Sequence, residues 1–243
     1  MSNVIGVLSA KGGVGKTTSA INIASALNQF GYSTLVLDTD ITSPNIGIYL
    51  GKSNHPYSLN HVLYSNIDIN KAIINHSSGI DVITGSLKPN IHQNVDYNQI
   101  DINIKRLINN YQFIIIDSAP GRYEDSIKYF STMKDIIVVT TPDLVAVTDA
   151  LRTVTAAKLN GKNVIGAILT RVGNNDYEIR KENVEAMLGV KVLASIPEDK
   201  NIPLSLKVNN PIIETHPNSD STIAYKKIAA NLLGQNYRVF DKV

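Results

Sequence analysis

The residues best suited to chemistry lie in one short segment, Ala10 to Thr18, which reads Ala-Lys-Gly-Gly-Val-Gly-Lys-Thr-Thr. Its glycines let the backbone adopt conformations that aim successive N–H groups at an anion. An apolar strand pattern precedes the segment and a helical pattern follows it, so the positive end of a helix dipole points at the same place. The segment therefore predicts a phosphate-binding loop formed by Gly12, Gly13, Val14 and Gly15.

The side chains that follow these glycines predict the rest of a nucleotide site. Lys16 can reach the β- and γ-phosphates, the Thr17 hydroxyl can bind Mg²⁺, and Thr18 is placed to contact the α-phosphate. The usual motif begins with glycine, whereas Ala10 stands there in this chain and a second lysine, Lys11, comes next. This form is called the deviant Walker A motif.

Carboxylates follow two later apolar runs. Asp38 and Asp40 end the run that begins at Leu35, and Asp117 ends the run that begins at Phe113. Ligands of open α/β sheets bind beyond the carboxyl ends of the strands, so these acids should lie beside the phosphate loop. We expect Asp40 to orient and deprotonate the attacking water, and Asp38 and Asp117 to hold Mg²⁺ through water.

Two further features belong to the predicted site. Pro120 and Gly121 break the strand that carries Asp117 into a loop able to sense the γ-phosphate. Asp149 lies off the apolar face of a predicted helix, where it either pairs with a lysine of the phosphate loop or is simply solvated.

The elements that must position these residues alternate along the chain. The predicted strands are Val4–Ser9, Ser33–Asp38, Ile80–Thr84, Phe113–Asp117, Ile136–Thr140, Val164–Thr170 and Lys191–Ala194. The predicted helices are Thr17–Phe30, Ile100–Asn110, Val145–Leu159, Tyr177–Leu188 and Thr222–Leu233. The polar stretch Lys52–Asn98 is expected to elaborate one sheet edge. The pattern predicts one α/β domain, residues 1–243: a doubly wound, mostly parallel sheet with helices on both faces, ending in a short tail, 235–243.

Composition narrows the class of protein. The formal net charge is +2, which is too small to make nucleic acid or an anionic membrane an obligatory partner. The sequence has no cysteine, so it supplies no thiolate for a disulfide or an iron–sulfur cluster. Because no apolar stretch approaches the length of a membrane span, we expect a cytoplasmic protein.

On these motifs the sequence resembles the MinD/ParA family of ATPases, and MinD more than ParA. Further segments fit the family pattern: Thr140–Asp143, Leu169–Arg171, Ile196–Asp199, Asn210–Pro211 and Asn231–Gly234. The resemblance implies ATP and Mg²⁺ as cofactors, an ATP-sandwich homodimer, and a role in spatial positioning that requires an unidentified activating protein. It also implies that Lys11 crosses the dimer interface to the partner's nucleotide, and that Thr170, Arg171 and Pro197 frame the adenine ring.

Other interpretations stay open. A DNA-partition ATPase would use surface basic pairs such as Lys105-Arg106, Arg180-Lys181 and Lys226-Lys227, and a metabolic ligase on the same fold would not need Lys11. Iron–sulfur carriers share the fold but hold their clusters with cysteine pairs. This class is disfavoured, because the sequence has no cysteine. In the tail, Tyr237, Phe240 and Val243 fall on one helical face near Arg238 and Lys242. Because so short a helix is marginal alone, we expect little or no membrane binding.

Overall fold

The structure of the chain is a computed structural model, which describes residues 2–65, 67–88, 96–119, 121, 124, 127, 128, 130–173, 175–235 and 237. These residues build one eight-stranded sheet with strand order β3-β4-β2-β5-β1-β6-β7-β8. Neighbouring strands are parallel except β3, which runs antiparallel to β4 at one edge. The mostly parallel α/β fold expected from the sequence is confirmed.

The strands are short and apolar. They are β1 (Asn3–Leu8), β2 (Thr34–Asp38), β3 (Ile74–Asn75), β4 (Asp81–Ile83), β5 (Phe113–Asp117), β6 (Asp135–Thr140), β7 (Asn163–Val172) and β8 (Val192–Pro197). Every predicted strand is present, with ends that differ by a few residues. Strand β3 was not predicted, because two residues carry no readable periodicity.

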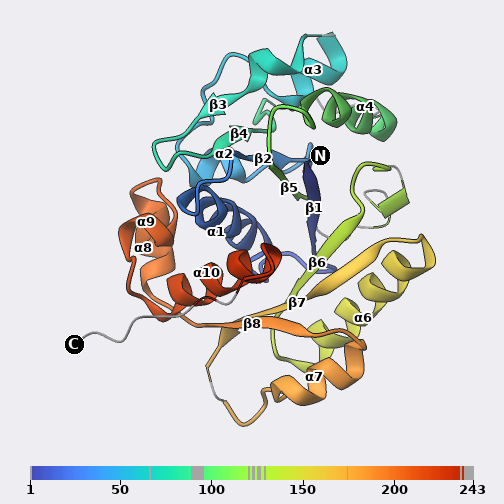
Figure 1. The fold of residues 1–243 in the computed structure, drawn as a ribbon, viewed down its shortest axis with the longest axis vertical. Coiled ribbons are helices and arrows are strands. Elements are labelled where there is room, and N and C mark those ends of the chain that lie inside the picture. The colour runs from blue at the N-terminus through green and yellow to red at the C-terminus, as the bar shows by residue number, and fades with distance from the viewer. Residues whose placement is uncertain are drawn as a thin grey trace.

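Helices cover both faces of this sheet (Figure 1). They are α1 (Lys16–Gln29), α2 (Ile46–Tyr49), α3 (Leu59–Ser65), the 3₁₀ helix η1 (Ile69–Ala72), α4 (Tyr97–Leu107), α6 (Leu144–Leu159), α7 (Lys181–Leu188), α8 (Asn201–Lys207), α9 (Ile212–Thr215) and α10 (Asp220–Leu232). Helices α1, α9 and α10 lie together on one side, and α4, α6 and α7 lie on the other.

Side chains of each strand alternate between two buried apolar cores. On β5, Ile114 and Ile116 enter the core under α4 and α6, while Phe113 and Ile115 enter the core under α1 and α10. Burial on both faces is the reason these strands are apolar without interruption. The arrangement brings the carboxyl ends of β1, β2, β5, β6 and β7 to one edge of the sheet.

The largest error in a predicted helix start is at α7. The pattern predicted a helix from Tyr177, but α7 begins at Lys181. The preceding residues are held by tertiary hydrogen bonds instead: the Glu178 carboxylate accepts from the Gly173 N–H at 2.9 Å, and the Ile179 N–H donates to the Pro142 carbonyl at 2.7 Å. The region Lys52–Asn98 is less irregular than expected, since α3, η1, β3 and β4 lie within it.

Candidate functional site

The phosphate loop joins the end of β1 to the start of α1. Gly13 and Gly15 have φ angles of 77° and 82°, in the left-handed region that side chains disfavour. Gly15 is the N-cap residue of α1, so the free N–H groups of the first helical turn face the loop. The loop therefore has the form that binds phosphate through backbone donors.

Three predicted residues meet directly behind this loop. The Lys16 ammonium is buried and forms an ion pair with the Asp117 carboxylate, and the Thr17 hydroxyl donates to the other Asp117 oxygen at 2.6 Å. Asp117 ends β5, next to the β1 strand that leads into the loop. The structure brings Lys16, Thr17 and Asp117 together, as a shared phosphate and metal site requires; their individual roles stay predictions.

Asp38 lies opposite Asp117 in the register of β2 and β5. One of its oxygens accepts from the N–H groups of Asn45 and Ile46, both at 3.0 Å. Burial, followed by the charge of Asp117, raises the pKa of Asp38 to about 8. Among the described residues Lys16 is the buried cation beside these two carboxylates, and an added positive ion would further relieve their repulsion.

These residues fit Mg²⁺. Among the described residues, no three His, Asp or Glu side chains gather into a metal-binding group of their own. Nucleotide-bound Mg²⁺ needs no such group, since it keeps water and phosphate oxygens as ligands and takes few from the protein. The Thr17 hydroxyl with Asp38 and Asp117 behind it is a donor set of this kind.

Asp40 lies just beyond β2 and is 4% exposed. Its Oδ1 accepts from the Thr42 hydroxyl at 3.1 Å and from the Ser43 N–H at 2.9 Å. Asp40 therefore orders the turn after β2, which is a structural role that the sequence reading did not assign to it.

Lys11 lies on the exposed side of the loop. Its ammonium lies 3.6 Å from the Asp149 carboxylate on α6, and its side chain is 43% exposed. Arg152 contacts the same carboxylate at 3.1 Å. Of the two alternatives left open for Asp149, the structure, which holds no nucleotide, shows the pairing with a lysine of the phosphate loop.

A cavity of about 460 Å³ opens beside the loop, within the size range of small-molecule sites. Its walls carry the loop residues from Lys11 to Thr18 except the buried Val14, together with Thr170, Arg171 and Pro197 at the ends of β7 and β8. The residues that the resemblance assigned to phosphate and to base thus line one continuous cavity.

Sequence reading missed part of this wall. Asn45, which precedes α2, and Tyr49 of α2 line the cavity, as do Ile202, Pro203 and Leu206 of α8. Helix α8 has seven residues and α2 has four, too few for helical periodicity to stand out. The apolar residues that follow Ile196–Asp199 at helical spacing were the one usable sign.

Several predicted features lie at the margin of the described residues. Pro120 lies outside them, whereas Gly121 is described and has a φ of 71°. In the tail, the centroid of the Tyr237 ring lies 6.0 Å from that of Phe30, which follows α1. Arg238, Phe240, Lys242 and Val243 lie outside the described residues. None of the described helices is both long and apolar enough to span a bilayer.

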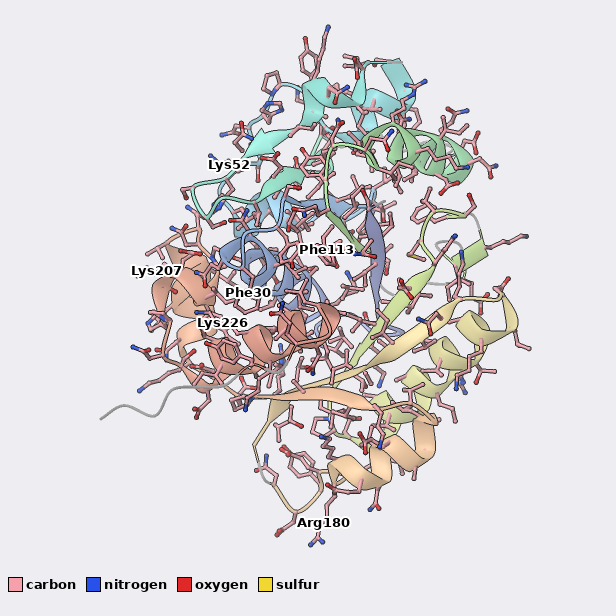
Figure 2. All side chains as sticks on the ribbon, in the orientation of Figure 1. Phe30, Lys52, Phe113, Arg180, Lys207 and Lys226 are labelled. Carbon is pink, nitrogen blue, oxygen red and sulfur yellow. The ribbon has the colours of Figure 1, made fainter. Side chains whose placement is uncertain are left out.

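The basic pairs considered for DNA binding lie on separate elements. Lys105 and Arg106 are on α4, where Lys105 pairs with Asp101 at 2.9 Å. Arg180 precedes α7 at one end of the molecule, and Lys226 is on α10 (Figure 2). The structure does not bring these pairs together within one chain.

Comparison with known proteins shows the family to which the chain is similar. A model described as ParA, NUBPL iron-transfer P-loop NTPase, matches residues 1–233. An uncharacterized ATP-binding protein of Methanocaldococcus jannaschii is 32% identical over 98% of this chain and 90% of its own.

Two solved structures are also similar. The cell division ATPase MinD of Pyrococcus furiosus superposes with a TM-score of 0.90 at 28% identity, over 96% of this chain and 99% of its own. The septum site-determining protein MinD of Pyrococcus horikoshii, solved in complex with Mg-ADP, gives 0.89 at 28% identity over 96% of each chain.

Proposed function

The chain belongs to the ParA/MinD family of P-loop NTPases, and we propose that it is a Mg²⁺-dependent ATPase switch. In this proposal it binds ATP, forms a homodimer around two ATP molecules, hydrolyses them to ADP and phosphate, and separates. The observation that carries the proposal is the pair of loop lysines: Lys16 is buried beside Asp117, while Lys11 points outward to Asp149. One lysine suits the chain's own nucleotide and the other suits a nucleotide held by a second copy.

Within the site, the loop N–H groups bind the phosphates and Lys16 moves from Asp117 to the phosphate oxygens. Mg²⁺, when bound, neutralises charge at the β- and γ-phosphates; Thr17 would hold it directly, and Asp38 and Asp117 through water. Asp40 orients and deprotonates the attacking water. These assignments are supported by the meeting of β1, β2 and β5 at one sheet edge.

Lys11 supplies the second subunit's contribution. An added positive charge at the γ-phosphoryl group stabilises the transition state, and charges supplied in this way are worth about 10³–10⁵ in rate. Because the γ-phosphate contacts both subunits only before cleavage, hydrolysis would favour the separated state.

The similar proteins named as MinD support a role in spatial positioning, either of the division site or of another structure. We expect an activating protein partner that stimulates hydrolysis. Iron transfer, which the family description also covers, is not favoured, because the sequence contains no cysteine to hold an iron–sulfur cluster.

The proposal is tested by ATP binding and phosphate release with Mg²⁺. Lys16→Ala should lower turnover by about a hundredfold or more, since it removes the cation aimed at the transferred phosphate. Lys227→Ala, which removes an exposed lysine of α10, is the matched control and should leave turnover unchanged. Wild-type protein that neither binds nor hydrolyses ATP would overturn the proposal.

A further inference from the structure

Thr170 occupies an unusual position at the end of β7. Its side chain is almost fully buried, at 4% exposed, yet it lines the nucleotide cavity. The ladder between β7 and β8 shifts register between Leu169 and Val172, and Arg171 in this bulge has a φ of 54°. Bulges of this kind re-aim side chains beside functional sites.

The bulge aims the Thr170 hydroxyl at the phosphate loop. The hydroxyl donates to the Val14 carbonyl at 2.6 Å and lies 3.2 Å from the Thr140 carbonyl at the end of β6. A hydroxyl has one hydrogen, so with two carbonyl acceptors this close it has none left to donate to a base, and only its lone pairs could still accept from one. The Thr170 methyl group also lies close to Gly15. A Cβ atom built onto Gly15 would be 3.5 Å from this methyl group.

Some backbone donors near the β8–α8 turn are also used. Pro197 has no N–H, the Glu198 N–H donates to the Val172 carbonyl at 3.0 Å, and the Ile202 N–H donates to the Asp199 carbonyl at 3.1 Å. Ile202, Pro203 and Leu206 add an apolar wall. These apolar side chains suit a flat ring held by shape, whereas the Thr170 hydroxyl faces the phosphate loop.

We propose that Thr170 is a positioning residue for the phosphate loop and does not read the base. This inference rests on the proposed function, because it concerns how the same site binds its nucleotide. It reverses the assignment that the family resemblance implied for Thr170. The hydroxyl fixes the Val14 carbonyl, and through it the loop between Gly13 and Gly15, in the conformation that receives phosphate.

The test compares three ligands that share phosphates and differ in base: Mg-ATP, Mg-GTP and Mg-tripolyphosphate. Each is titrated against wild-type protein, Thr170→Val and Thr170→Ser by displacement of a fluorescent ATP analogue. Valine keeps the shape and removes the donor, whereas serine keeps the donor. Melting without nucleotide confirms that each variant is folded.

We expect Thr170→Val to weaken all three ligands by the same factor, about tenfold, because the loop loses the bond that holds its conformation. Thr170→Ser should recover most of the affinity. If Thr170→Val does not fold, Thr170→Ala is measured in the same way.

A loss confined to ATP, with tripolyphosphate binding unchanged, would show that Thr170 reads the base and would overturn the inference alone. Equal affinity of Thr170→Val and wild type for all three ligands would also overturn it. Failure of the wild-type protein to bind ATP would instead contradict the proposed function, and the inference with it.

Discussion

Asp38 and Asp117 end neighbouring strands, and Lys16 is the one buried cation described beside them. Their proximity was expected from the sequence because both acids follow apolar runs, and parallel strands end at the same sheet edge. The contacts of Asp40 were not predictable in this way. They depend on how the turn after β2 closes on Thr42 and Ser43, which no periodicity reports.

At the residue scale, Asp40→Ala should lower ATP turnover by about 10²–10⁴-fold while ATP affinity stays within a few-fold of wild type. Affinity should be kept because Asp40 is not among the residues that line the nucleotide cavity. Turnover should fall because the proposed base is removed. Phosphate release and equilibrium binding check the two halves of this prediction.

Asp40→Asn is the matched control, since an amide oxygen can still accept the hydrogen bonds from Thr42 and Ser43. It should keep the turn and lose turnover. If Asp40→Asn is as active as wild type, Asp40 acts only by ordering the turn and is not the base.

At the element scale, Asp101 links α4 to the segment before β6 by hydrogen bonds. Its carboxylate accepts from the Ser131 hydroxyl at 2.6 Å and from the Thr132 N–H and hydroxyl at 2.9 and 2.6 Å. Burial alone would raise the pKa of Asp101, but these hydrogen bonds outweigh it and lower the pKa to about 2. This contact was invisible in the sequence, because it joins residues about thirty positions apart.

Asp101→Asn should destabilise the protein by about 1–3 kcal/mol at pH 7, the usual effect of weakening hydrogen bonds to a charged group. Because the pKa is lowered on folding, the carboxylate stabilises the fold above its unfolded pKa of about 4. That contribution is lost as the pH falls toward 2. Urea unfolding at several pH values measures the unfolding free energies of wild type and Asp101→Asn. The difference between them should shrink as the pH falls.

Lys105→Ala is the control for this contact, since Lys105 is a half-exposed partner of the same carboxylate. It should change the unfolding free energy by less than about 1 kcal/mol. A difference between Asp101→Asn and wild type that stays constant from pH 7 to pH 2 would contradict the role given to the charge.

Lys11 forms an ion pair with Asp149 of α6, and in the proposed dimer cycle that pair must break before Lys11 reaches a second subunit. Asp149→Ala should therefore lower the ATP concentration at which dimers form, by up to about fivefold, as expected for a partly exposed ion pair. Arg152→Ala leaves the contact with Lys11 in place and is the control. Sedimentation at a series of ATP concentrations measures the shift, and an increase in the required ATP would contradict this role of Asp149.

At the scale of the whole molecule, the order of strands and helices was predictable because parallel strands covered on both faces are apolar throughout. The phosphate loop was predictable because its glycines and lysines are close together in sequence. The far wall of the cavity was not, since α2 and α8 are short and come from distant parts of the chain. Nor was the bond from Thr170 to Val14, which depends on a bulge in β7.

Dimer formation controlled by ATP is the central feature of the proposed switch. The most direct test is the solution mass of Asp40→Ala, measured by light scattering without nucleotide, with Mg-ADP and with Mg-ATP. We expect the monomer mass of 26.5 kDa without nucleotide and with Mg-ADP, and twice that mass only with Mg-ATP. A mass that does not respond to nucleotide would contradict the switch.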